Sequence, residues 1–145
     1  MTKSEVAINK FKDGYNCSQS VVYCFSDQLG ISKDFALKMS NGFGGGMGRK
    51  QEVCGAVTGG ILVLNLLYGR GENEDKAKQE TTYSKVRELV DQFEAKHETV
   101  ICKRLLDGCE LLTVEGQERF KSEKLITKCH CYVSDAVEIL EGMVV

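Results

Sequence analysis

The chain has no proline among its 145 residues, and this absence constrains its fold more than any other feature. Proline breaks helices and marks many turns. Runs of alternating apolar and polar residues, which are typical of half-buried strands, are also few. We therefore expect an all-α fold, a bundle of about five to six helices joined by glycine turns. At 42% hydrophobic residues the chain can bury a core without disulfides, so we expect one domain over residues 1–145.

The spacing of apolar residues and of capping residues predicts the positions of these helices. The expected helices cover residues 2–14, 17–29, 32–39, 54–68, 73–97 and 129–144, with a short helical turn at 102–106 and a loop with a helical turn at 113–128. The helix at 54–68 is apolar nearly all round, which predicts a central, buried position. The long helix, with Asn73 as its cap, has an expected inward face of Tyr83, Val86, Val90, Phe93 and His97.

A glycine-rich segment, Asn41–Gly48, precedes the central helix. Its sequence, Asn-Gly-Phe-Gly-Gly-Gly-Met-Gly, is unsuited to any regular element, because glycine favours flexible and left-handed backbone. We expect a loop here, in which Gly44, Gly45 and Gly46 shape a site. The segment superficially resembles a phosphate-binding loop, but no Gly-Lys-Ser/Thr follows it, so a nucleotide site is not expected.

Cys54 stands at the head of the central helix and is followed by Gly55, Gly59 and Gly60. Unpaired N–H groups and the helix dipole favour negative charge at a helix N-terminus, so we expect thiolate character for Cys54. The three glycines leave no side chain beside its sulfur, which would admit a cofactor, a substrate or another helix. Each glycine costs about 1 kcal/mol relative to alanine inside a helix, so a site or tight helix packing is needed to explain them.

The chain has seven cysteines, an odd number that cannot pair completely. The N-terminus has no apolar signal region, and the longest apolar stretch is too short to span a bilayer, so we expect a cytoplasmic protein. Thiols stay reduced in the cytoplasm, and cysteine enrichment there indicates metal, cluster or redox use. A net charge of −2 and a pI near 5.8 give no reason to expect nucleic acid or a membrane as partner.

Four of the cysteines share one setting, near a helix start and on an inward face. They are Cys17, Cys54, Cys102 and Cys129. Their helix N-termini could converge on one pocket. Cys24 and Cys109 are expected in the core, with a role as resolving thiols as the alternative, and Cys131 should point elsewhere. His130 could be a ligand or lie on an exposed turn, whereas His97 is expected to be a core histidine. No CxxC is present, which excludes a thioredoxin-like dithiol and a paired-CxxC zinc ribbon.

These residues resemble a known family. An early cysteine in GYNCSQSV, the segment FGGGMGRKQEVCGAVTGG, a cysteine before KRLL and one before YVSDAVEIL are similar to the C_GCAxxG_C_C family of redox-active proteins. The family label has Gly-Cys-Ala where this chain has Cys-Gly-Ala. The resemblance implies a small helical protein associated with electron transfer and iron–sulfur chemistry. It maps the family cysteines onto Cys17, Cys54, Cys102 and Cys129, with Cys131 as the competing choice for the last.

The leading hypothesis is an iron–sulfur cluster held by these four thiolates, which exchanges electrons with a redox partner protein. A second is metal-free thiol–disulfide chemistry, with Cys54 as the attacking thiolate and Cys17, Cys102 or Cys129 as the resolving thiol. A third is a structural zinc site with four thiolate ligands in an interaction module. A thiol-rich core without any site is the fourth. A homodimer is also compatible with a small helical chain.

Overall fold

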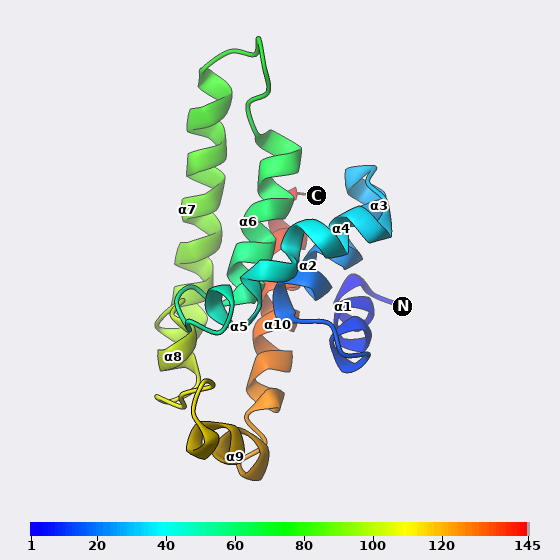
Figure 1. Cartoon of the computed structure of the whole chain (residues 1–145). Helices are drawn as coiled ribbons and strands as arrows, with labels where there is room; N and C mark the ends of the chain where they lie inside the picture. The colour runs from blue at the N-terminus through cyan, green and yellow to red at the C-terminus, as the bar shows by residue number, and fades with distance from the viewer. Residues whose placement is uncertain (145) are drawn as a thin grey trace.

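The computed structural model describes residues 1–144, in which the regular elements are helices joined by turns and loops, apart from one isolated bridge between Val53 and Ile101 (Figure 1). The elements are α1 (Lys3–Lys12), α2 (Cys17–Cys24), α3 (Ser26–Leu29), α4 (Lys33–Ser40), the 3-10 turn η1 (Asn41–Phe43), α5 (Gly44–Met47), α6 (Gly55–Tyr68), α7 (Ala77–His97), α8 (Cys102–Leu105), α9 (Val114–Ser122) and α10 (Ile126–Val144). The all-α prediction is confirmed, and the helices are more numerous than the five to six expected.

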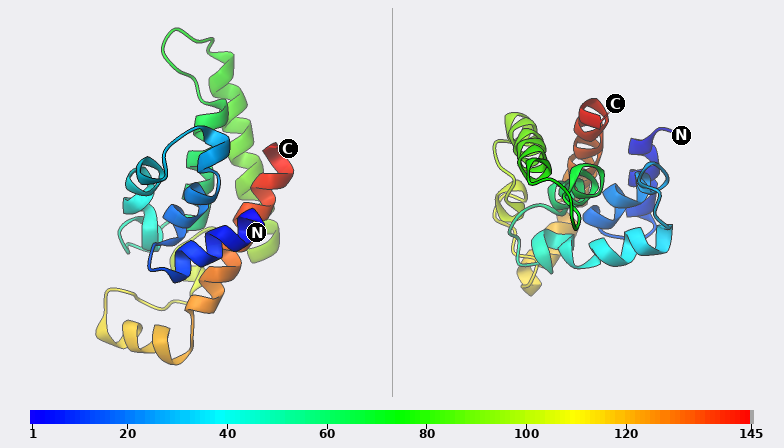
Figure 2. Two further views of the ribbon diagram at one scale, coloured as in Figure 1. Left: turned by 90° about the vertical axis from the view of Figure 1, so that its right-hand side faces the viewer. Right: turned by 90° about the horizontal axis from the view of Figure 1, so that it is seen from above.

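Helix α6 is the centre of the molecule and packs against α2, α7 and α10. Figures 1 and 2 show α6, α7 and α10 running side by side, with α1 to α4 on one flank and α9 at one end. The α6–α7 connection protrudes at the opposite end. The main core is formed by fully buried side chains of these helices, including Val21, Phe25, Val57, Leu64, Leu89, Phe93, Val133 and Leu140.

Two consecutive glycines allow α6 to take this central place. A Cβ atom on Gly59 would stand 2.8 Å from the Ser18 carbonyl oxygen, so the backbones of α2 and α6 touch there. A Cβ atom on Gly60 would stand 2.8 Å from Leu89 and 3.3 Å from Leu140. Gly59 therefore permits the approach of α2, and Gly60 permits the approach of α7 and α10.

Local hydrogen bonds fix where the first helices begin. The Thr2 hydroxyl accepts from the Glu5 amide at 3.1 Å, and the Glu5 carboxylate accepts from the Thr2 amide at 3.0 Å. Asn16 and Gln19 form the same reciprocal pair of bonds at the start of α2, each 3.0 Å long. Such a capping box satisfies two backbone donors that a helix start otherwise leaves open.

Three expected helix boundaries are wrong. The helix expected at 17–29 is divided at Phe25, whose φ of −101° and ψ of 0° interrupt it between α2 and α3. The long helix begins at Ala77, because Asn73 has a φ of 63° and lies in a turn instead of capping the helix. The loop expected at 113–128 contains α9, whose first turn is capped by a bond from the Gly116 amide to the Thr113 hydroxyl at 2.9 Å.

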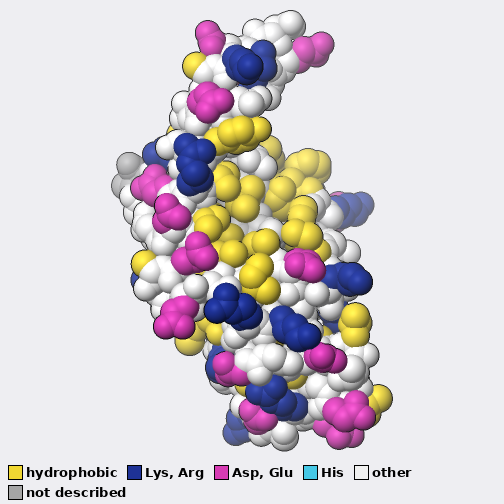
Figure 3. Space-filling model, turned by 90° about the vertical axis from the view of Figure 1, so that its left-hand side faces the viewer, with side chains coloured by type: hydrophobic (Ala, Val, Ile, Leu, Met, Phe, Trp, Pro, Cys, Tyr) yellow, Lys and Arg dark blue, Asp and Glu magenta, His cyan; other side chains and the backbone are white. Residues whose placement is uncertain are grey.

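The expected inward face of α7 is partly wrong as well. Tyr83 is 51% exposed, while Thr82, Leu89 and Phe93 are buried. Val86 and Val90 are half-buried and pack at the edge of the core. Tyr83 and the exposed Leu66 of α6 line one surface hollow and form a short apolar strip on the α6–α7 face. Figure 3 shows hydrophobic side chains gathered on one face of the molecule. Among residues 1–144, no helix combines the length and the apolar character that a membrane crossing requires.

The α2–α6 contact gives a testable prediction. Gly59→Ala should lower the free energy of unfolding by about 1–3 kcal/mol, because the new methyl group has no room beside α2. Gly142 in α10 is the matched control, since a Cβ atom there would meet nothing within 4 Å. Gly142→Ala should raise the free energy of unfolding by up to about 1 kcal/mol through helix propensity. Urea unfolding followed by circular dichroism measures both, and equal effects would contradict the packing argument.

Candidate functional site

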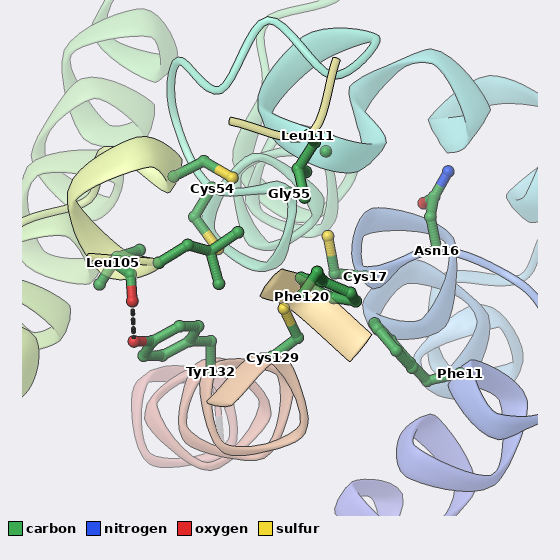
Figure 4. Close-up of a pocket in the computed structure, with 13 residues that line it drawn as sticks. Phe11, Asn16, Cys17, Cys54, Gly55, Leu105, Leu111, Phe120, Cys129 and Tyr132 are labelled. Carbon is green, nitrogen blue, oxygen red and sulfur yellow. Dashed lines mark hydrogen bonds between the residues drawn. The ribbon is translucent and has the colours of Figure 1, made fainter. Parts of the chain in front are cut away.

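Four cysteine side chains line one cavity of about 130 Å³. They are Cys17, Cys54, Cys102 and Cys129, the four that the sequence groups together. The labelled side chains of Cys17, Cys54 and Cys129 point into this space from three different helices or their ends (Figure 4). The rest of the wall is largely apolar and includes Phe11, Leu105 and Phe120.

Each of these cysteines lies at or near a helix N-terminus. Cys17 is the first residue of α2 and Cys102 the first of α8, whereas Cys54 is the cap residue preceding α6. Cys129 lies in the first turn of α10. The helix starts therefore converge from four parts of the chain that are distant in sequence.

A short pair of extended segments joins Cys54 to Cys102. The Cys54 amide donates to the Val100 carbonyl, and the Cys102 amide donates to the Glu52 carbonyl, both at 2.7 Å. These bonds flank the antiparallel bridge between Val53 and Ile101. Sequence patterns do not reveal this pairing, because each segment is too short to show an alternating pattern.

The glycine-rich segment forms a compact left-handed turn instead of an open loop. Gly45, Gly46, Met47 and Gly48 have successive φ angles of 65°, 69°, 69° and 60°. Residues other than glycine rarely adopt this conformation, which costs about 1–2 kcal/mol per residue. Glycine is also required by space, because a Cβ atom on Gly46 would stand 2.8 Å from the Cβ atom of Cys102.

The other glycines that were expected to shape the site lie at different distances from the cavity. A Cβ atom on Gly55 would overlap the Cys17 sulfur, and one on Gly44 would overlap the Asn16 side chain. Gly45 and Gly55 line the cavity. Gly59 lies outside it and acts only through the α2–α6 contact described above.

The expectation that Cys54 has thiolate character is wrong, because the pKa of its thiol is raised. Burial raises the pKa of Cys54 well above 9, the nearby Cys17 raises it further, and the Ala56 amide lowers it only in part. Burial likewise raises the pKa of Cys102 to about 11 and that of Cys129 to about 12. Loss of hydration outweighs the helix N-terminus here, so the metal-free cavity holds neutral thiols at neutral pH.

Hydrogen-bond donors nevertheless face two of the sulfurs. Burial raises the pKa of Cys17, and the backbone amides of Gly45, Ser18 and Gly55 oppose this by bonding to its sulfur. The Gln51 side chain does the same at Cys102. The geometry thus supplies partners for negative sulfur at positions where burial alone would suppress it.

The remaining cysteines and histidines do not line the cavity. Cys131 is exposed, so Cys129 and not Cys131 is the cavity residue of α10. Cys109 is buried and donates to the Gly116 carbonyl, while Cys24 donates to the Val21 carbonyl. His130 packs edge-on against Phe11. His97 is half-buried and bonds to Asp135 at 2.7 Å, which agrees with its expected structural role.

Sequence reasoning missed the polar residues that support the site. Gln51 donates to the Cys109 carbonyl at 2.6 Å and accepts from the Leu111 amide at 2.9 Å, which ties the segment after α8 to the cavity. The Tyr132 hydroxyl donates to the Leu105 carbonyl at 2.7 Å, drawn as a dashed line in Figure 4. Neither Gln51 nor Tyr132 has a local sequence signal for this role. The Asn16–Gln19 capping box beside Cys17 does have one, an N-cap residue followed by glutamine three positions later.

Residues 1–144 contain no group of three or more His, Cys, Asp or Glu side chains arranged to hold a single metal ion. A tetrahedral zinc site requires sulfurs about 3.8 Å apart, given a Zn–S bond of about 2.3 Å. The four cysteines that share the cavity do not form such an arrangement in the described residues.

A family model described as "Putative redox-active protein (C_GCAxxG_C_C)" matches residues 15–143, which include all four cavity cysteines. The chain belongs to this family. No curated protein and no solved structure matches the chain.

The Tyr132 bond gives a second prediction. Tyr132→Phe should lower the free energy of unfolding at pH 7 by about 1–2 kcal/mol, because the Leu105 carbonyl loses its donor in a buried setting. Tyr83→Phe is the control, since Tyr83 is 51% exposed. Urea unfolding of both variants should show a loss for the first and almost none for the second.

The same bond predicts a pH dependence. Burial, with smaller effects of Cys129 and Cys54, raises the pKa of Tyr132 to about 12 from 10.0. Between these values the unfolded chain has released the proton and the folded chain still holds it, so the folded wild type loses stability as pH rises. Tyr132→Phe lacks this proton. The stability difference between wild type and variant should therefore shrink above pH 10, and a constant difference would contradict the pKa.

Proposed function

We propose that Cys17, Cys54, Cys102 and Cys129 bind an iron–sulfur cluster through which this cytoplasmic protein exchanges electrons with a redox partner protein. The single observation that carries the proposal is the shared cavity, in which four thiols from four segments of the chain face one space. Four cysteine thiolates are a sufficient ligand set for a [2Fe–2S] or a [4Fe–4S] cluster. Such a cluster supplies one-electron chemistry.

The size of the cavity supports this proposal over a single zinc ion. A volume of about 130 Å³ far exceeds the roughly 10–15 Å³ that one water molecule requires. In a [4Fe–4S] cluster each cysteine sulfur binds a different iron, so the four sulfurs lie farther apart than they do around one ion.

Burial of the sulfurs argues against metal-free thiol–disulfide exchange. Cys54 is 6% exposed and Cys102 is 8% exposed. An attacking thiol must be ionised and within reach of a substrate disulfide. Neither condition holds at Cys54 in the described conformation. The exposed Cys131 is accessible but lies outside the cavity.

The surrounding residues have definite tasks under this proposal. Cationic iron would offset the burial that keeps the thiols neutral, because metal binding displaces thiol protons. The amides of Gly45 and Gly55 would donate to the Cys17 sulfur, and Gln51 would donate to the Cys102 sulfur. Hydrogen bonds to the sulfurs and low solvent exposure both tune the reduction potential of a cluster. Phe11 and Phe120 would exclude water.

Anaerobic purification with metal analysis tests the proposal. The pure protein should be brown and contain iron and sulfide in the stoichiometry of one cluster. Serine substitution of each cavity cysteine should remove at least about half of the iron or change the paramagnetic resonance spectrum, because thiolates are the natural ligands of these clusters. Cys24→Ser and Cys131→Ser are the matched controls and should keep wild-type iron content, since neither residue lines the cavity.

Each other outcome identifies a different function. Colourless protein with one tightly held zinc that depends on the same four cysteines would replace the cluster by a structural site. Metal-free protein with one thiol that alkylates much faster than free cysteine would favour thiol–disulfide chemistry. If Cys54→Ser changes neither metal content, thiol reactivity nor stability, the cavity is only a thiol-rich part of the core.

A homodimer is a further prediction for this protein. The apolar strip that includes Leu66 and Tyr83, which are 47% and 51% exposed, is the surface that would benefit from cover. Light scattering of the purified protein should then give twice the 16.1 kDa mass of one chain. A Leu66→Lys variant should halve that mass, and a monomeric wild type at micromolar concentration would refute the dimer.

A further inference from the structure

A second hollow lies on the outer side of the cysteine cavity. This groove, of about 510 Å³, is formed where α1, the end of the left-handed turn and the α8–α10 segment meet. Phe11, Leu111 and Phe120 line both the groove and the cavity. One layer of side chains therefore separates the groove from the cysteine sulfurs. Phe11 and Phe120 are seen beside the cavity cysteines in Figure 4.

The groove has an apolar floor that reaches the surface. Leu112 is 66% exposed and Ile126 is 41% exposed, and both line it. Large side chains exposed to this degree side by side are uncommon on a protein surface unless something covers them. Apolar contact at the centre is also the usual composition of a protein–protein interface.

The charge at the groove is of one sign. Its two charged side chains, Arg49 and Lys121, are both cationic and both exposed. Neither forms an ion pair with any residue of the described chain, 1–144, whereas Lys103, Arg119 and Lys128 nearby are paired with carboxylates. The whole chain carries a net charge of −2, so this positive groove contrasts with the rest of the molecule.

We propose that this groove is the docking site of an acidic electron-transfer protein, an inference that rests on the cluster proposed above. The partner would place carboxylates against Arg49 and Lys121 and an apolar patch against Leu112 and Ile126. One electron would pass between the partner's redox centre and the cluster through the Phe11–Leu111–Phe120 wall, with no atom exchanged. Electron transfer falls steeply with distance, and these three side chains line both the groove and the cavity.

Two other occupants fit the groove less well. A second copy of the chain docked symmetrically would bring the same cations against each other, which costs free energy. A small anion would find two exposed cations but would leave Leu112 and Ile126 uncovered. An acidic protein satisfies both the charge and the apolar surface.

A double charge reversal tests the docking site. Arg49→Glu/Lys121→Glu is compared with Arg87→Glu/Lys76→Glu, whose residues are exposed on or beside α7 and away from the groove. Both pairs change the net charge equally, so only the position of the charge differs. The probe is a reduced plant-type ferredoxin, an acidic one-electron donor, mixed with the oxidised anaerobic protein in a stopped-flow instrument.

We expect the groove pair to lower the second-order rate constant about tenfold or more at low ionic strength, because steering charges raise association rates by factors of about 10–1000. The control pair should stay within about twofold of wild type. The difference should shrink in high salt, since screening removes steering. Leu112→Ser should lower the rate several-fold at any salt concentration, because it removes the apolar contact and leaves the charge unchanged.

The readouts separate failure of docking from failure of the cluster. Iron, sulfide and the spectrum after reduction by dithionite are measured first, and they must be the same in wild type and all variants. Protein without iron overturns the proposed function itself. Loaded protein whose two charge-reversal pairs slow equally overturns the docking site. A groove pair that instead changes the mass in light scattering identifies a second copy as the occupant and also overturns it.

Discussion

The close contact between α2 and α6 is the constraint on which the rest of the structure depends. Gly55 and Gly59 lie one helical turn apart on α6, and a side chain on either would collide with Cys17 or Ser18 of α2. This contact fixes Cys17 beside the start of α6, where Cys54 stands. On another side of the same helix, Gly60 permits the approach of α7 and α10. Packing of the core and placement of the sulfurs thus share one cause.

Two opposing electrostatic effects act on the sulfurs in the cavity. Helix starts and backbone amides favour negative sulfur, while burial favours the neutral thiol, and burial wins in the metal-free molecule. A cationic group in the cavity would reverse that balance, since the donors around Cys17 are already in place. In this chain the donors around Cys17 therefore favour sulfur that carries negative charge, whereas burial disfavours a free thiolate.

The sequence predicts the helical class, the central position of α6 and the grouping of four cysteines, because each depends on local spacing. Three features lacked a local signal. The left-handed turn at 45–48 depends on contact with Cys102, and the Val53–Ile101 pairing joins two segments too short for a strand pattern. Helix α9 has few apolar residues, so its periodicity is weak. The thiolate expected at Cys54 failed because a helix start is visible in sequence and the depth of burial is not.

The distribution of the cavity cysteines along the chain sets the order of assembly. Paired cysteines in one loop can capture a metal while most of a polypeptide is still unfolded. Here Cys129 belongs to α10, so the cavity is complete only after this helix has docked beside the segments that carry Cys17, Cys54 and Cys102. If the cavity binds the cluster proposed above, insertion of the cluster follows folding. The chain without the cluster would then fold through its apolar core alone, and a donor of iron and sulfide would have to recognise that folded form.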